Sequence, residues 1–187
     1  MLAFIDKVKP DVVTVEIEHV DVDALEAIVA QKSMVPPVFR RVGLSFLFID
    51  VPVHPSPATI KVIQDKYAQK VHLSKAQLPV APYVDAKNGL EDIKAAGKAF
   101  GYPLLLKSKT LAYDGRGNAT VKSEEGIAGA LKSLVSTDVY VEQFVSFTKE
   151  IAVMVARDPA GHIVSYPCVE TIQKVVQGFK KIKMMLE

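Results

Sequence analysis

The sequence predicts a mixed fold of helices and short strands, an α/β or α+β arrangement, from three observations. A run rich in β-branched residues at 11–17 precedes a segment whose apolar residues have helical spacing. From Thr59 onward, helical patterns alternate with short apolar runs of the length of buried strands. A glycine-rich loop at residues 112–118 separates two of these runs. Such alternation is typical of domains that layer helices on a sheet.

The first part of the chain has the pattern of one strand–helix unit. Residues 11–17 (DVVTVEI) are expected to form a strand, and Asp21 or Asp23 is expected to cap the following helix. Since a complete three-layer domain needs several such units, we expect residues 1–33 to be the remnant of a larger domain. Residues 34–58 contain five prolines and are predicted to be a linker or insertion with at most one strand.

Residues 59–173 have the pattern of a second domain. A helix is predicted to begin at a Thr59 cap, with Ile60, Ile63, Tyr67 and Val71 on one face. Further helices are predicted at 90–100 and 127–134, and strands at 104–107, 119–122, 139–143, 150–157 and 162–169. Residues 174–187 form a basic tail, for which an amphipathic helix and a frayed, solvated end are equally good interpretations.

Composition excludes several classes of protein. A net charge of +2 is too small to indicate a nucleic-acid partner. Cys168 is the only cysteine, so an internal disulfide is impossible, and its apolar neighbours favour a buried structural role over that of a nucleophile. No apolar run approaches the roughly 20 residues that span a bilayer, and no signal peptide is visible, so we expect a soluble protein.

The glycine-rich loop has the composition of a phosphate-binding segment. Gly115 and Gly117 lack Cβ atoms, so the backbone can bend tightly and direct its N–H groups at an anion. Lys107, Lys109 and Arg116 add positive charge suited to phosphate oxygens. A plain hairpin turn is an equally good interpretation, because Asp-Gly is a common turn sequence. The spacing is not that of a Walker loop.

Two weaker patterns accompany it. The strand end at Glu142–Val145 could pair its backbone with an adenine edge, and Glu150 could accept ribose hydroxyls, although most such strand ends are simply solvated. Glu16, Glu18 and His19 suggest a metal or acid–base site. Without a third ligand a polar strand terminus is the better interpretation, and we predict no metal site.

Taken in order, these segments closely resemble the ATP-grasp carboxylases of purine biosynthesis. This family comprises 5-(carboxyamino)imidazole ribonucleotide synthetase and the homologous part of eukaryotic phosphoribosylaminoimidazole carboxylase. The matching stretches are DVVTVEIEHVD (11–21), PSPATIKVIQDKYAQKVH (55–72), FGYPLLLKSKTLAYDGRGN (100–118), YVEQFVSFTKE (140–150) and YPCVETIQ (166–173). The residues of these stretches are most similar to those of the plant and fungal enzymes. The resemblance implies a partial pre-ATP-grasp strand–helix unit followed by an incomplete ATP-grasp fold.

The resemblance also implies an activity and its residues. ATP would phosphorylate bicarbonate, and the exocyclic amine of 5-aminoimidazole ribonucleotide would then be carboxylated. Lys66 and Lys107 would contact the ATP phosphates, and Glu16 would lie near the imidazole nucleotide. The lid would comprise Ala112, Tyr113, Asp114, Gly115, Arg116, Gly117 and Asn118; the adenine site would comprise Glu142, Gln143, Phe144 and Val145, with Glu150 at the ribose.

Departures from the family pattern limit the expected activity. The family's amino-terminal glycine-rich unit is missing, residues 34–50 have no counterpart, and Gln173 replaces a histidine. The match stops at Lys174, and the ligands that hold Mg²⁺ in the family lie beyond that point. We therefore expect a truncated member that binds ATP but is impaired in turnover.

Other interpretations stay open. They are a non-catalytic module that pairs with a full-length subunit, another ATP-grasp ligase, and an altered gene model that does not fold stably. A homo-oligomer is compatible with the sequence. Relatives occur in the cytoplasm or the plastid, and no targeting segment is visible.

Overall fold

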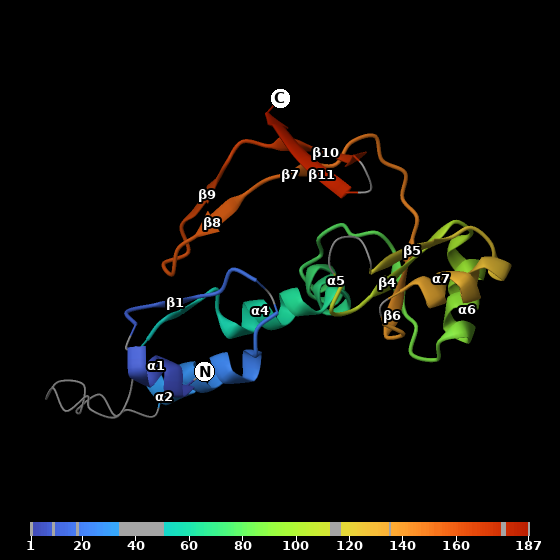
Figure 1. The fold of residues 1–187 in the computed structure, drawn as a ribbon. Helices are drawn as coiled ribbons and strands as arrows, with labels where there is room; N and C mark the ends of the chain where they lie inside the picture. Colours follow the sequence, from blue (N-terminus) through green and yellow to red (C-terminus); the bar gives the residue numbers. More distant parts are fainter. Residues whose placement is uncertain are drawn as a thin grey trace, which may run out of the picture. The chain divides into compact units, whose positions relative to one another are not determined.

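The computed structural model describes residues 2–8, 10–17, 19–33, 51–112, 117–134, 136–176 and 179–186. The chain divides into two compact units, residues 1–143 and 144–187, and each is described here by itself (Figure 1). Both contain strands, and the first also contains the described helices, so the predicted mixed fold is confirmed. Residues 34–50 of the predicted linker or insertion at 34–58, and Tyr113–Arg116 of the predicted lid, lie outside the described residues.

The first unit begins with a small helix-and-strand layer. Its elements are α1 (Leu2–Val8), β1 (Val13–Thr14), α2 (Val22–Ser33) and β2 (Val53–His54). The predicted strand is thus shorter than expected, and it pairs in parallel with β2. The predicted cap is confirmed, because the Ala24 N–H donates to Asp21 Oδ1 at 3.1 Å. Ile5, Leu25 and Ile28 pack with Val51 and Val53 in a local core.

The single helix predicted from Thr59 is wrong in two respects. The segment forms two helices, α4 (Pro57–Gln64) and α5 (Lys66–Lys75), and Ser56 rather than Thr59 caps the first. Asp65 separates them because its backbone is extended and its Oδ1 accepts the N–H groups of Tyr67 at 2.8 Å and Ala68 at 2.9 Å. Aspartate favours such a cap over a helix interior, so it ends one helix and starts the next.

A four-stranded sheet in the order β3–β6–β4–β5 forms the centre of the first unit. Its strands are β3 (Tyr83–Asp85), β4 (Leu104–Ser108), β5 (Asn118–Val121) and β6 (Val139–Gln143), and its helices are α6 (Leu90–Phe100) and α7 (Ile127–Ser133). All three strand pairs are antiparallel. The predicted helices, strands and β4–β5 hairpin in this region are therefore confirmed.

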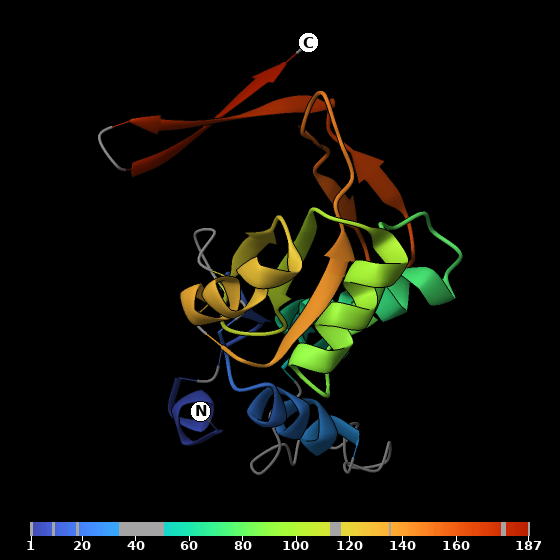
Figure 2. The same cartoon turned by 90° about the vertical axis from the view of Figure 1, so that its right-hand side faces the viewer.

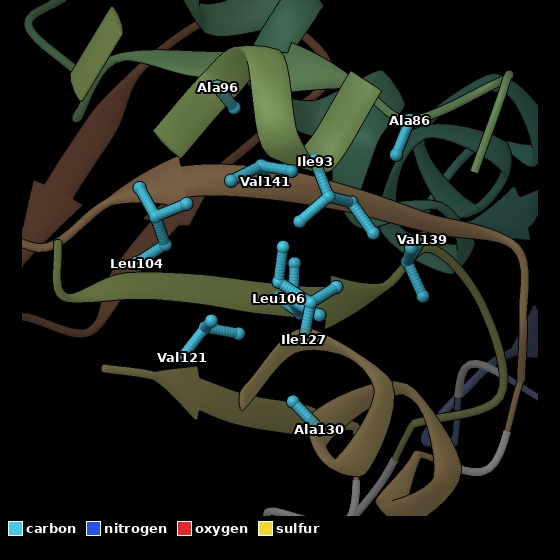
Figure 3. Close-up of a cluster of buried hydrophobic side chains, with 10 residues drawn as sticks. All are labelled: Ala86, Ile93, Ala96, Leu104, Leu106, Val121, Ile127, Ala130, Val139 and Val141. Carbon is cyan, nitrogen blue, oxygen red and sulfur yellow. The ribbon is translucent and has the colours of Figure 1, made fainter. Parts of the chain in front are cut away.

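One face of this sheet carries the core. Helices α6 and α7 lie against the same side of the sheet (Figure 2), and Figure 3 shows their apolar side chains directed at the strands. The cluster comprises Ala86, Ile93, Ala96, Leu104, Leu106, Val121, Ile127, Ala130, Val139 and Val141. Since successive residues of a strand point to opposite faces, Leu104 and Leu106 enter this core while Leu105 and Lys107 point away from it.

The second unit consists of short strands. They are β7 (Ile151–Ala152), β8 (Val155–Arg157), β9 (Ile163–Ser165), β10 (Val169–Val176) and β11 (Phe179–Leu186). The predicted turn between β8 and β9 is confirmed, with Gly161 N–H donating to Asp158 O at 3.0 Å. The predicted strand at 150–157 is divided into β7 and β8, which belong to different sheets.

Two expectations for this unit are wrong. The tail forms β11, which pairs antiparallel with β10 from Val169↔Leu186 to Val176↔Phe179, in place of a helix or a frayed end. The pairing supplies backbone partners that the spacing of apolar residues does not reveal. Cys168 is exposed and not buried, because it lies in the connection before β10. None of the described helices is long and apolar enough to cross a membrane.

Candidate functional site

The second face of the four-stranded sheet collects polar side chains. In the strand register, Lys107 of β4 lies opposite Tyr140 of β6, and Tyr83 of β3 lies opposite Glu142 of β6. Alternation along each strand therefore places these residues on one face. Because Leu106 and Val141 occupy the other face, the same strands carry both a core and a polar surface.

Helix α5 packs against this polar face. The Tyr67 ring lies 5.6 Å from the Tyr83 ring and 5.8 Å from the Tyr140 ring, measured between centroids. Tyr83 and Ser74 also share a hydrogen bond of 3.0 Å. These aromatic contacts fix the helix on the sheet. As a result, Lys70 of α5 lies within reach of Glu142 on β6.

A buried carboxylate joins α5, β4 and β6. Glu142 Oε1 lies 3.0 Å from Lys70 Nζ, and Glu142 Oε2 lies 3.1 Å from Lys107 Nζ. The Glu142 side chain is 5% exposed, against 19% for Lys70 and 24% for Lys107, so the carboxylate is nearly buried and both lysine side chains are partly exposed. Two ammonium groups on one carboxylate leave a net positive charge. Each ammonium has three N–H donors, so one contact to Glu142 leaves donors for a further anion.

The charge state of this cluster follows from its surroundings. Burial alone would raise the pKa of Glu142, but the hydrogen bond from Lys70 and the nearby charge of Lys107 hold that pKa below its usual value. Burial and the Glu142 charge raise the pKa of the Tyr140 phenol far above its usual range. Tyr140 is therefore neutral, and its hydroxyl donates to Glu142 Oε1 at 3.0 Å.

A second ion cluster surrounds Lys109, just beyond the end of β4. Lys109 Nζ lies 2.8 Å from Asp85 Oδ1 and 2.8 Å from Asp138 Oδ1, and 5.4 Å from the centre of the Tyr67 ring. Burial lowers the pKa of this lysine, but the two carboxylates outweigh burial and raise it. The Lys109 backbone N–H donates to Asp138 O at 3.0 Å, and its carbonyl accepts the Lys66 N–H at 2.8 Å. Lys109 thus fastens the first turn of α5 to the end of β4.

The two ends of the glycine-rich loop meet at a tight base. Ser108 N–H donates to Gly117 O at 2.8 Å, and Lys66 Nζ donates to Ala112 O at 3.4 Å. Gly117 is buried, and a Cβ there would overlap the Cβ of Ala112. This close approach requires glycine at position 117. Lys66 therefore lies at the base of the predicted lid.

A hollow of about 450 Å³ lies beside this base. It is lined by His19, Val20, Gln64, Thr110 and Leu111. Glu16, which was predicted near the imidazole nucleotide, is exposed on the bend after β1 and does not line this hollow. His19 and Val20 are the lining residues that follow Glu16 in the chain.

The remaining predicted residues belong to different parts of the structure. Asn118 lies on β5 opposite Lys107, and Gln143 ends β6 with its N–H donating to Pro82 O at 2.9 Å. Phe144 and Val145 are exposed in the second unit. Glu150 lines a separate hollow of about 320 Å³ in that unit, together with Phe147, Thr148, Lys149, Glu170, Thr171 and Ile172. The structure thus brings Lys107 to Glu142 and Lys66 to Ala112.

Sequence reasoning missed several residues of the site. It assigned no role to Lys70, Tyr140 or Asp85, and it treated Lys109 only as a positive charge. A helical signal was available for Lys70, because Lys66 and Lys70 are spaced i, i+4 and therefore share a helix face. Among the described residues, no three His, Cys, Asp or Glu side chains are grouped so that they could hold a metal ion.

The fold and the glycine-rich loop agree with a comparison of the sequence with known families. The family described as "ATP-grasp domain" matches residues 71–179, and the chain belongs to the ATP-grasp family. A phosphoribosylaminoimidazole carboxylase from Candida glabrata is 46% identical over 166 residues, which are 89% of this chain and 26% of that protein. The chain therefore spans about a quarter of the length of this relative.

Solved structures show the same relationship. A carboxyaminoimidazole ribonucleotide synthase from Aspergillus clavatus, complexed with ATP, is 38% identical with a TM-score of 0.75 over 92% of this chain and 40% of that one. The same enzyme in complex with ADP and 5-aminoimidazole ribonucleotide is 36% identical, with a TM-score of 0.72 over 91% of this chain and 39% of that one. The fold of this chain is thus part of an ATP-grasp fold.

Proposed function

We propose that this chain binds ATP and is the nucleotide-binding part of an enzyme that carboxylates 5-aminoimidazole ribonucleotide with ATP and bicarbonate. The observation that carries the proposal is the cationic cluster on the polar face of the sheet. There, Lys107 approaches a buried carboxylate that it shares with a second lysine. A triphosphate would find ammonium donors on this face, next to the base of a glycine-rich loop.

The proposed phosphate contacts are Lys107, Lys66 and the loop. The Lys107 side chain is partly exposed, and the Lys66 ammonium lies at Ala112 O, where the loop begins. Gly117 lets the two loop ends approach closely, so the backbone N–H groups of the loop could face a phosphate. The proposed adenine contacts are Glu142–Val145, and the proposed ribose contact is Glu150, which lines a hollow in its own unit.

The proposed reaction is inferred from the relatives, which are a carboxylase and synthases solved with ATP or with ADP and 5-aminoimidazole ribonucleotide. ATP would phosphorylate bicarbonate to carboxyphosphate and leave ADP. The amine of the imidazole nucleotide would then attack the carbon of carboxyphosphate, form a C–N bond and release phosphate. Glu16 is the proposed neighbour of that nucleotide. Mg²⁺ would neutralise the transferring phosphates. Among the described residues, no cluster of three acidic, histidine or cysteine side chains fits such an ion. That the protein is located in the cytoplasm or the plastid, and that it forms a homo-oligomer, remain predictions.

The test is a calorimetric titration of the full chain with ATP. Lys107→Met keeps the apolar stem of the side chain and removes its charge, so the ATP dissociation constant should rise about tenfold or more. Lys94→Met is the matched control, because Lys94 on α6 is a partly exposed lysine paired with Glu124 at 3.3 Å, away from the polar face. The control should bind ATP like the unaltered chain. Equal affinity of the Lys107 variant and the control would refute the proposal.

A further inference from the structure

The proposed ATP site gives Lys70 no role. Its Nζ nevertheless lies 3.0 Å from Glu142 Oε1, as close as Lys107 Nζ is to Oε2 at 3.1 Å. We propose that Lys70 is a positioning residue that neutralises Glu142, so that the positive charge of Lys107 stays available to a phosphate group. This inference rests on the proposed function. It concerns the charge of the site and adds no direct contact between Lys70 and the nucleotide.

Each oxygen of the Glu142 carboxylate has its own lysine partner. Lys70 lies at Oε1, where the Tyr140 hydroxyl also donates, and Lys107 lies at Oε2. The Glu142 side chain is nearly inaccessible to water. Solvent therefore cannot screen its negative charge, and the neighbouring side chains must do so.

The net charge of the Glu142 cluster depends on Lys70. With Lys70 in place, two ammonium groups face one carboxylate and the cluster is cationic. Without Lys70, Lys107 and Glu142 would form a neutral pair, which attracts a polyanion much less. The Lys109 cluster cannot supply the missing charge, because Lys109 already lies between Asp85 and Asp138.

Lys70 is held at Glu142 by the position of helix α5. It lies one turn after Lys66 on α5, and that helix is fixed at its start by the Asp65 cap and by the bond from Lys66 N–H to Lys109 O. The Tyr67 ring contacts hold the same helix on the sheet. Lys70 is therefore placed at Glu142 by a helix that several contacts within the first unit hold on the sheet.

The experiment measures binding of inorganic tripolyphosphate and ATP to the full chain. Tripolyphosphate is used because it lacks adenine, so a change at Glu142 cannot act through the proposed adenine contact. Lys70→Met should weaken tripolyphosphate binding about tenfold, because one unit charge is lost several ångströms from the anion. Lys70→Arg should restore most of the affinity, and Lys94→Met should leave it unchanged.

A second variant keeps the inference testable if Lys70→Met does not fold. Glu142→Gln removes the negative charge and leaves both lysines, so it should tighten tripolyphosphate binding by about three- to tenfold. A purely structural Glu142 would instead give unchanged or weaker binding, and that result would overturn the inference. In the double variant Lys70→Met/Glu142→Gln, affinity should return close to that of the unaltered chain.

The two proposals fail in different ways. If Lys107→Met binds ATP and tripolyphosphate as well as Lys94→Met does, the proposed function itself is refuted. If Lys107→Met loses affinity but folded Lys70→Met does not, only the positioning role of Lys70 is refuted. Urea unfolding of each variant shows whether it is folded under the conditions of the titration.

Discussion

Replacement of Leu106 by alanine tests whether β4 separates the core from the polar face. Leu106 is 0% exposed and belongs to the cluster that includes Ile93, Ile127 and Val141. Leu105, the preceding residue, points to the other face and is only partly buried. The two leucines are chemically identical neighbours with different surroundings, so Leu105→Ala is a control for the change of residue type.

The expected cost of Leu106→Ala follows from its burial. Loss of the transfer free energy of the removed carbons contributes about 2 kcal/mol at roughly 0.8 kcal/mol per buried CH₂. Helices α6 and α7 both contribute side chains to this cluster and limit its collapse (Figure 3). A residual cavity raises the total to about 3–4 kcal/mol, within the range measured for buried leucines. Leu105→Ala should cost about 1 kcal/mol, because a partly exposed side chain loses less burial.

The measurement is urea unfolding followed by circular dichroism, with ATP titration at a temperature where each variant is folded. The Leu106 variant should have a lower free energy of unfolding but an unchanged ATP dissociation constant, since Leu106 does not face Lys107. A cost for Leu105→Ala equal to or above that of Leu106→Ala would refute the assignment of the two faces. Loss of ATP binding in a folded Leu106→Ala variant would also refute this assignment.

Two further predictions concern α5 and Glu142. Asp65→Ala removes the acceptor for two backbone N–H groups and should lower the free energy of unfolding by about 1 kcal/mol, measured by thermal unfolding, whereas Asp65→Asn should cost less. Because the pKa of Glu142 is below its usual value, its contribution to stability is complete above the unfolded-state pKa of about 4.3 and is lost as pH falls through the folded-state pKa. Urea unfolding between pH 7 and pH 3 should show a weaker acid destabilisation for Glu142→Gln, and identical pH profiles would contradict this.

The parts of the fold that were predictable have strong local patterns. The α6 helix and the β4–β5 hairpin were predictable because apolar periodicity and glycine or proline boundaries agree there, and β6 was predictable from its β-branched and aromatic residues. The break at Asp65 was missed because apolar residues continue at helical spacing across it, and only the cap geometry distinguishes two helices from one. The β10–β11 pairing was missed because the same residues fit a helix period until a partner strand is present.

The site was predictable only where chemistry and spacing coincide. Lys66, Lys107 and the loop were identified through a resemblance, whereas the loop residues alone did not decide between a lid and a turn. Lys70 was missed, and Lys109 was given a phosphate role in place of its ion pairs, because the partners of both lysines lie far away in the sequence. Lys70 meets a carboxylate on β6, and Lys109 meets Asp85 on β3. Such long-range pairs are set by strand register, which no local pattern contains.

The strand register also explains why two ion clusters can lie on one face without neutralising one another. Lys107 and Lys109 are two residues apart at the end of β4, so both lie on the side away from the core. Asp85 and Tyr140 are register partners on β3 and β6, and Glu142 lies two residues further along β6. Asp85 pairs with Lys109 and Glu142 pairs with Lys107, so each lysine has its own carboxylate. The second partner differs in sign. Asp138 is a second carboxylate at Lys109, and Asp85 also meets Lys87 at 3.8 Å, so this cluster has no net positive charge and fastens α5. Lys70 instead makes the Lys107 cluster cationic and suited to a phosphate.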